Sequence, residues 1–153
     1  MKDIVRFALS GLSLLPEKMN THEARAMLLA IGLQESRFEH RFQVGGPARG
    51  FWQFEKGGGV KGVLDHHSTK EYITGVCKTL RIPATETDCY EAIAYNDPLA
   101  CCFARLLLYT LPVKLPLKNE SQKGWEQYIA AWRPGKPHFE SWGAYFNTAW
   151  LYD

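Results

Sequence analysis

The segment ARAMLLAIGLQESRF occupies residues 24–38 and repeats apolar side chains at helical spacing. The positions that share one face are Ala24, Leu28 and Ile31. One further step of four residues reaches Glu35, so a continuous helix would turn this carboxylate toward the apolar side. Burial against such a surface raises the pKa of a carboxyl group and keeps a proton available for donation near neutral pH. The alternative is that Gly32 ends the helix and leaves Glu35 solvated on a loop.

Most of the remaining chain also carries helical periodicity. Capping residues, prolines and apolar stripes predict helices over 4–12, 72–80, 85–95, 97–111, 121–132 and 142–149. In the fourth of these helices Asp97 is the expected N-cap, with Pro98 in the first turn. The aromatic residues of the last two helices recur at core spacing, which favours packing over sugar binding. These patterns predict a mainly α (α+β) protein in which residues 1–153 form a single domain.

Residues 40–60 break the helical pattern directly after Glu35. Phe42 and Val44 alternate with polar residues, a Gly-Gly-Pro turn follows, and three aromatic residues precede the glycine run 57–59. We expect one small β-hairpin lobe here.

Composition excludes several classes of protein. The chain has 153 residues, 46% of them apolar and 22% charged, with a formal net charge of +2. These values fit one ordinary globular domain and give no basic footprint for nucleic acid. The longest apolar stretch, 99–111, contains Arg105 and is shorter than a bilayer span, so we expect no stable membrane insertion.

The N-terminus and the cysteines have simple interpretations. Lys2 and Arg6 precede an apolar run and could imitate a secretory signal, but Asp3 and the lack of a small-residue cleavage site favour a short amphipathic helix.

The four cysteines, at 77, 89, 101 and 102, form no C-x-x-C pair and lie in apolar surroundings. We expect them to be small buried side chains, and we expect neither a metal site nor a cofactor.

Three short motifs give the chain a resemblance to a known family. They are Glu35-Ser36-Arg37-Phe38, Gly50-Phe51-Trp52-Gln53 and Ala94-Tyr95-Asn96. In this order and spacing they resemble the branch of the lysozyme superfamily that contains soluble lytic transglycosylases, goose-type lysozymes and related phage endolysins. The resemblance covers residues 20–100. The chain departs from the family pattern at Phe51, at Glu55 and at Asp97-Pro98, where the family carries Leu, an apolar segment and Ala-Gly.

The resemblance implies a lysozyme-like fold and a peptidoglycan-degrading muramidase, most simply a phage endolysin. Such an enzyme cleaves the β-1,4 bond between N-acetylmuramic acid and N-acetylglucosamine. Glu35 would be the general acid, with Ser36 beside it, Gln53 in the cleft wall, and Tyr95 and Asn96 facing it. The implied partners are glycan strands and the expected state is a monomer. The expected route is synthesis in the host cytoplasm without a cleaved signal peptide, followed by action on the cell wall in the periplasm.

Glycoside hydrolysis usually needs a second carboxylate, and Glu55 is the first candidate. Strand alternation would turn Glu55 to the same face as Gln53, whereas the alternative is a solvated carboxylate on a turn. Trp52, inside the hairpin motif, is the expected platform for sugar stacking. Without a second carboxylate the enzyme would be a lytic transglycosylase that gives 1,6-anhydro products. Further alternatives are a chitinase and a non-catalytic peptidoglycan-binding or virion structural module.

Overall fold

The computed structural model describes residues 2–152 and shows an all-α protein. Three short helical segments, η1 (Ser10–Leu14), η2 (Glu17–Met19) and the π-helical η3 (Lys56–Val60), accompany eight α-helices in these residues. The α-helices are α1 (Lys2–Leu9), α2 (His22–Ser36), α3 (Lys61–Asp65), α4 (Lys70–Leu80), α5 (Glu86–Ile93), α6 (Asp97–Tyr109), α7 (Ser121–Trp132) and α8 (Phe139–Tyr152). The predicted helices are therefore confirmed, including the amphipathic one at the N-terminus.

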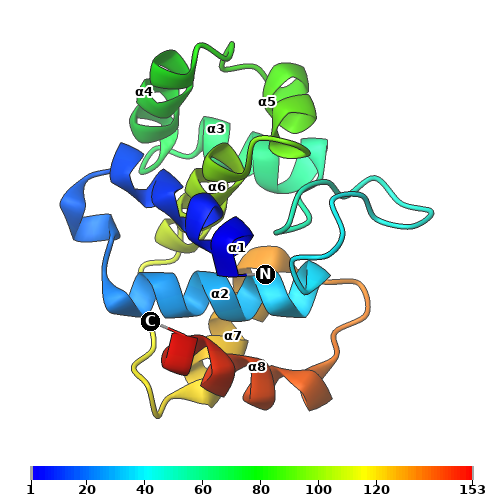
Figure 1. Ribbon diagram of the computed structural model, residues 1–153. Helices are drawn as coiled ribbons and strands as arrows, with labels where there is room; N and C mark the ends of the chain where they lie inside the picture. Colours follow the sequence, from blue (N-terminus) through cyan, green and yellow to red (C-terminus); the bar gives the residue numbers. More distant parts are fainter. Residues whose placement is uncertain (1, 153) are drawn as a thin grey trace.

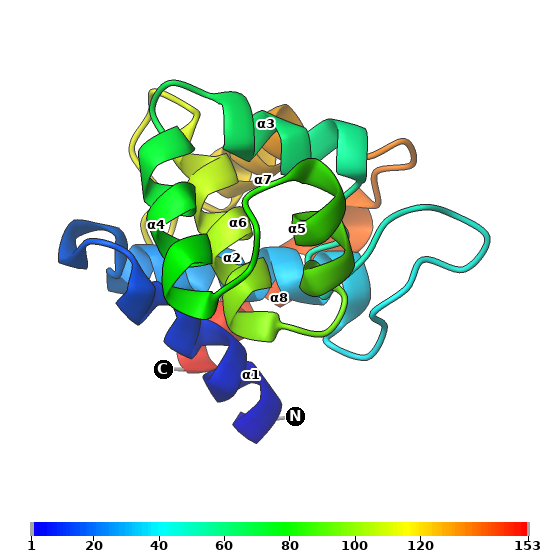
Figure 2. The same ribbon diagram turned by 90° about the horizontal axis from the view of Figure 1, so that it is seen from above.

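Two long helices organise the packing. Figure 1 shows α2 running across the molecule with α7 and α8 on one side and α6 on the other, while α3, α4 and α5 lie beyond α6. Seen from above in Figure 2, α4 and α5 flank α6. Helix α6 is buried on nearly all sides, as expected for a helix whose apolar residues encircle it.

Helix α2 continues through Gly32 to Ser36, so the alternative in which Gly32 ends the helix is wrong. Thr21 caps its N-terminus through a hydrogen bond from the Ala24 amide. Gly32 instead makes room for a side chain: a Cβ there would lie 2.1 Å from the ring of Phe38. Close packing, rather than helix termination, explains this glycine.

The predicted β-hairpin is wrong: no strand forms within residues 2–152. Residues 40–54 make a loop with only two isolated bridges, and this loop extends away from the helices in both views (Figures 1 and 2). Left-handed backbone at Gly45, Gly50 and Gln53 interrupts any continuous ladder. Val44, expected to alternate with polar residues in a strand, is 93% exposed, so no buried face fixes a register.

An ion pair attaches this loop to the helices. Arg41 donates to both carboxylate oxygens of Asp97, with 2.9 Å to Oδ2, and its guanidinium lies 4.3 Å from the centre of the Phe51 ring. Asp97 is therefore not the N-cap of α6 that the sequence suggested. Asn96 fills that position by accepting from the Leu99 amide at 3.1 Å. The loop is thus held to the start of α6 by charge and not by strand pairing.

The core contains the cysteines, as predicted, and three of the nine aromatic residues of α7 and α8; four more of these aromatic residues are partly buried against it. All four cysteines are free and buried. Tyr128, Trp142 and Phe146 are almost fully buried. Within the described residues, no helix combines the length and apolar character needed to cross a membrane.

Candidate active site

Glu35 lies in the last turn of α2, half-buried, with its side chain directed toward α7. The Tyr128 hydroxyl, on α7, donates a short hydrogen bond to Glu35 Oε2. Continuation of the helix through Gly32 is what brings the carboxylate to this partner. The expected orientation of Glu35 toward the apolar side is thereby confirmed.

Burial dominates the electrostatics of this carboxyl group. Desolvation raises the pKa of Glu35 to about 7, although the Tyr128 hydrogen bond acts in the opposite direction by stabilising the carboxylate. Burial and the neighbouring carboxylate raise the pKa of Tyr128, so its hydroxyl stays protonated and can donate. Glu35 therefore exchanges its proton near neutral pH, which suits an acid that later acts as a base.

The position of Tyr128 is fixed by aromatic packing. Its ring is stacked on Trp142 with the centroids 5.4 Å apart and the planes 9° from parallel. The rings of Trp125 and Trp132, which precede and follow Tyr128 on α7, also contact its ring. A hydroxyl held in this way can direct one carboxylate oxygen and leave the other available.

A pocket of about 250 Å³ opens beside Glu35. Gln34 connects the ends of α2 and α8 at its rim: Gln34 Nε2 donates to the His138 carbonyl at 2.8 Å, and Gln34 Oε1 accepts from the Ser141 hydroxyl at 2.9 Å. The described residues that line it are Leu33, Gln34, Glu35, Ser36, Arg37, His40, His138, Ser141 and Tyr145. Glu35 is the only carboxylate among these lining residues.

Ser36 is buried and forms structural contacts. Its hydroxyl donates to the Phe51 carbonyl at 2.7 Å and accepts from the Phe38 amide at 3.1 Å. The bond to Phe51 joins the motif at residues 35–38 to the motif at residues 50–53. Ser36 thus holds the loop against the end of α2 and does not present its hydroxyl to a ligand.

Trp52 and Gln53 occupy structural positions as well. Trp52 is 1% exposed and its indole nitrogen donates to the Leu28 carbonyl at 2.8 Å, so the ring offers no face for the expected sugar stacking. Gln53 has left-handed backbone and is half-buried, with Nε2 donating to the Gly50 carbonyl at 2.9 Å. Neither side chain lines the Glu35 pocket.

The third motif lies at a different surface. Tyr95 is 72% exposed and contacts Phe42 edge to face, and Asn96 caps α6. Both line a shallow pocket with Phe7, and neither lines the Glu35 pocket. The structure therefore does not bring Tyr95 and Asn96 to the proposed acid.

Glu55 is exposed at the start of η3 and lines a separate pocket of about 600 Å³. The alternation that would have turned it toward Gln53's face does not exist, because no strand forms. Trp132 links the two regions: it contacts Tyr128 on one side, and on the other it packs against Phe54 and donates to the Trp52 carbonyl at 2.8 Å. Glu35 and Glu55 consequently line different pockets.

Sequence reasoning missed the role of Tyr128, which it assigned to the core. The available signal was a hydroxyl on an apolar stripe, since a buried tyrosine usually finds a hydrogen-bond partner.

Groups of three or more potential metal ligands are absent from residues 2–152. Fold and site together define an all-α protein with one half-buried carboxylate at the end of its central helix. Comparison with family models, with curated proteins and with solved structures found no match to this chain.

Proposed function

We propose that this protein cleaves the glycan of peptidoglycan between N-acetylmuramic acid and N-acetylglucosamine, with Glu35 as the general acid. The observation that carries the proposal is the half-buried Glu35, whose pKa of about 7 leaves a proton for donation at neutral pH. The three ordered motifs, which resemble those of lysozyme-type enzymes, support the substrate class.

The chemistry begins with proton transfer from Glu35 to the leaving glycosidic oxygen as the bond from C1 breaks. Tyr128 then stabilises the new carboxylate by the hydrogen bond it already donates. A carboxylate with a pKa of about 7 is basic enough to take a proton in the second step.

The second step favours the transglycosylase outcome over hydrolysis. Hydrolysis with two carboxylates requires them to face one bound sugar, and Glu55 lines a different pocket from Glu35. With Glu35 alone, the 6-hydroxyl of the muramic acid attacks C1 and gives its proton to the Glu35 carboxylate. The product is a 1,6-anhydro end, and Glu35 is again protonated.

Release of soluble fragments from purified peptidoglycan tests the proposal. We expect wild-type protein to release them and Glu35→Gln to lose at least about 100-fold in rate, as is typical when a general acid is removed. Glu39→Gln is the matched control, because Glu39 is exposed and lies four residues further along the chain. Equal rates for wild type and Glu35→Gln would remove Glu35 from the reaction. Release of fragments from chitin but not from peptidoglycan would instead assign the chitinase alternative.

A further inference from the structure

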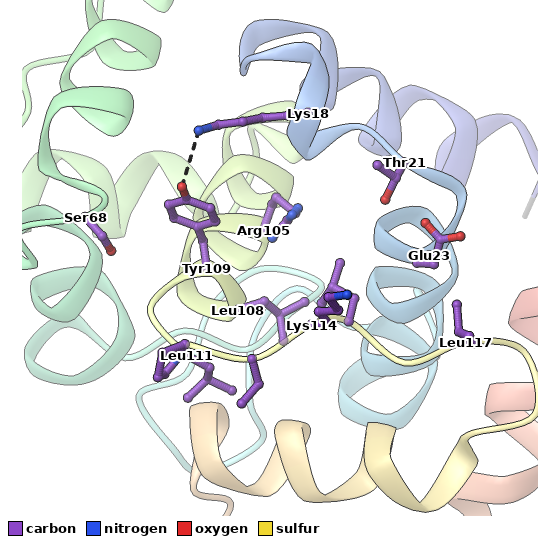
Figure 3. Close-up of a pocket in the computed structure, with 13 residues that line it drawn as sticks. Lys18, Thr21, Glu23, Ser68, Arg105, Leu108, Tyr109, Leu111, Lys114 and Leu117 are labelled. Atoms are coloured by element: carbon purple, nitrogen blue, oxygen red, sulfur yellow. Dashed lines mark hydrogen bonds between the residues drawn. The ribbon is translucent and has the colours of Figure 1, made fainter.

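A second pocket lies at the opposite end of α2 from Glu35. It has a volume of about 700 Å³ and is bounded by η2, the first turn of α2, the C-terminal half of α6 and the connector 111–117 (Figure 3). Since α2 rises about 1.5 Å per residue, Thr21 at the pocket and Glu35 are roughly 20 Å apart. This pocket therefore plays no part in the proposed cleavage site.

Arg105 lies at the inner side of this pocket and is only 6% exposed. Its Nε donates to the Met19 carbonyl at 2.9 Å. Among the described residues no partner bonds its terminal nitrogens, and these nitrogens are not fully enclosed, so they keep access to the pocket. Figure 3 shows Arg105 and Tyr109 extending from α6 toward the segment that carries Lys18.

No carboxylate within residues 2–152 pairs with Arg105, although the loop arginine, Arg41, is paired with Asp97. Burial lowers the pKa of Arg105, which reflects the cost of a desolvated charge without a counter-ion. An arginine remains charged in proteins, so a ligand that supplies a negative charge would compensate this cost.

The rest of the lining adds positive charge and apolar surface. Lys18 and Lys114 are exposed at the rim, and Glu23 is the only acidic residue that lines the pocket. Lys18 is already engaged with Tyr109, whose hydroxyl lies 3.4 Å from its ammonium group. The apolar lining residues are Leu108, Leu111, Pro112, Val113, Leu115 and Leu117.

We propose that this pocket binds a small amphiphilic carboxylate. Its carboxylate accepts from the free terminal nitrogens of Arg105, whose planar fork matches two carboxylate oxygens. Its apolar chain lies along the leucine and valine side chains of the connector. The volume is within the range of pockets that enclose small organic ligands. This proposal is independent of the chemistry at Glu35.

Calorimetric titration with octanoate, 1-octanol and inorganic phosphate tests it. We expect octanoate to bind and the other two to bind at least tenfold more weakly, because each lacks one of the two recognised features. Arg105→Met should lose at least tenfold in octanoate affinity, whereas Arg6→Met, which removes an exposed arginine of α1, should bind like wild type. Octanol or phosphate binding as tightly as octanoate would overturn the assignment, and so would an unchanged Arg105→Met variant.

A second measurement protects the test against misfolding of Arg105→Met. Amide chemical shifts of the wild-type protein, followed during octanoate titration, should change in residues 18–23 and 105–117. Changes confined to other segments, or no changes at millimolar octanoate, would contradict the proposal.

Discussion

The Tyr128 hydroxyl donates to Glu35 Oε2 and so connects the middle of α7 to the last turn of α2, across 93 positions of sequence. This hydrogen bond is the most specific feature of the candidate site. It fixes one oxygen of a carboxyl group that burial otherwise keeps protonated. The balance between these two effects sets the pH at which Glu35 can act.

Tyr128→Phe should move the alkaline limb of the lytic pH profile upward by about one unit, since the lost hydrogen bond had stabilised the charged form of Glu35. The ring should stay stacked on Trp142, so the fold is retained. Rates of peptidoglycan solubilisation from pH 5 to pH 9 measure this shift. A limb that stays in place or moves downward would show that Tyr128 does not control the acid.

Glu35→Gln should stabilise the folded protein at high pH. The folded-state pKa of about 7 exceeds the ordinary value of 4.5, so wild-type stability is full below pH 4.5 and falls as pH rises to about 7. Above that window the variant should be more stable than wild type by up to about 3 kcal/mol, and at pH 4 the difference should nearly vanish. Urea denaturation at pH 4 and pH 8 measures both values. A difference independent of pH would mean that burial does not perturb Glu35.

Asp97→Ala should destabilise the protein by about 2 to 4 kcal/mol, because it leaves the Arg41 guanidinium without its partner beside the start of α6. Asp65→Ala provides the control: it breaks the exposed Lys61–Asp65 pair, which solvent screens, and should destabilise the protein much less. Chemical denaturation compares the two variants. Equal losses would remove the anchoring role assigned to the Arg41–Asp97 pair.

Much of the helical fold could be predicted from the chain, because its apolar stripes and capping residues are local signals. The conformation of the 40–54 loop could not be predicted from such local signals. Phe42 and Val44 show the alternation of a strand, but the backbone turns left-handed at Gln53 and the loop is held by the pair between Arg41 and Asp97. An ion pair between distant residues leaves no periodic pattern in the sequence.

The candidate site was predictable only in part. Glu35 follows from the spacing of a single helix, but its partner Tyr128 comes from another helix 93 residues away. Trp52 belongs to the motif at residues 50–53, yet it is buried by contacts that involve Phe38, Leu28 and Trp132. Residue type and motif position do not report which aromatic rings reach the surface.

Glu55→Gln should keep activity within about twofold of wild type, because Glu55 is exposed and lines a pocket that Glu35 does not. The sequence alone suggested the opposite, on the basis of a strand that does not form. Solubilisation assays at pH 7 on both proteins decide between them. A loss approaching that of Glu35→Gln would restore Glu55 as the second catalytic group.

The masses of the fragments released from purified peptidoglycan test the central claim most directly. Glu35 acting alone predicts 1,6-anhydro-muramic ends, lighter by one water than reducing ends, in the wild-type digest and at least about 100-fold fewer of them with Glu35→Gln. Reducing ends in the wild-type digest, or equal amounts of fragments from both proteins, would contradict it.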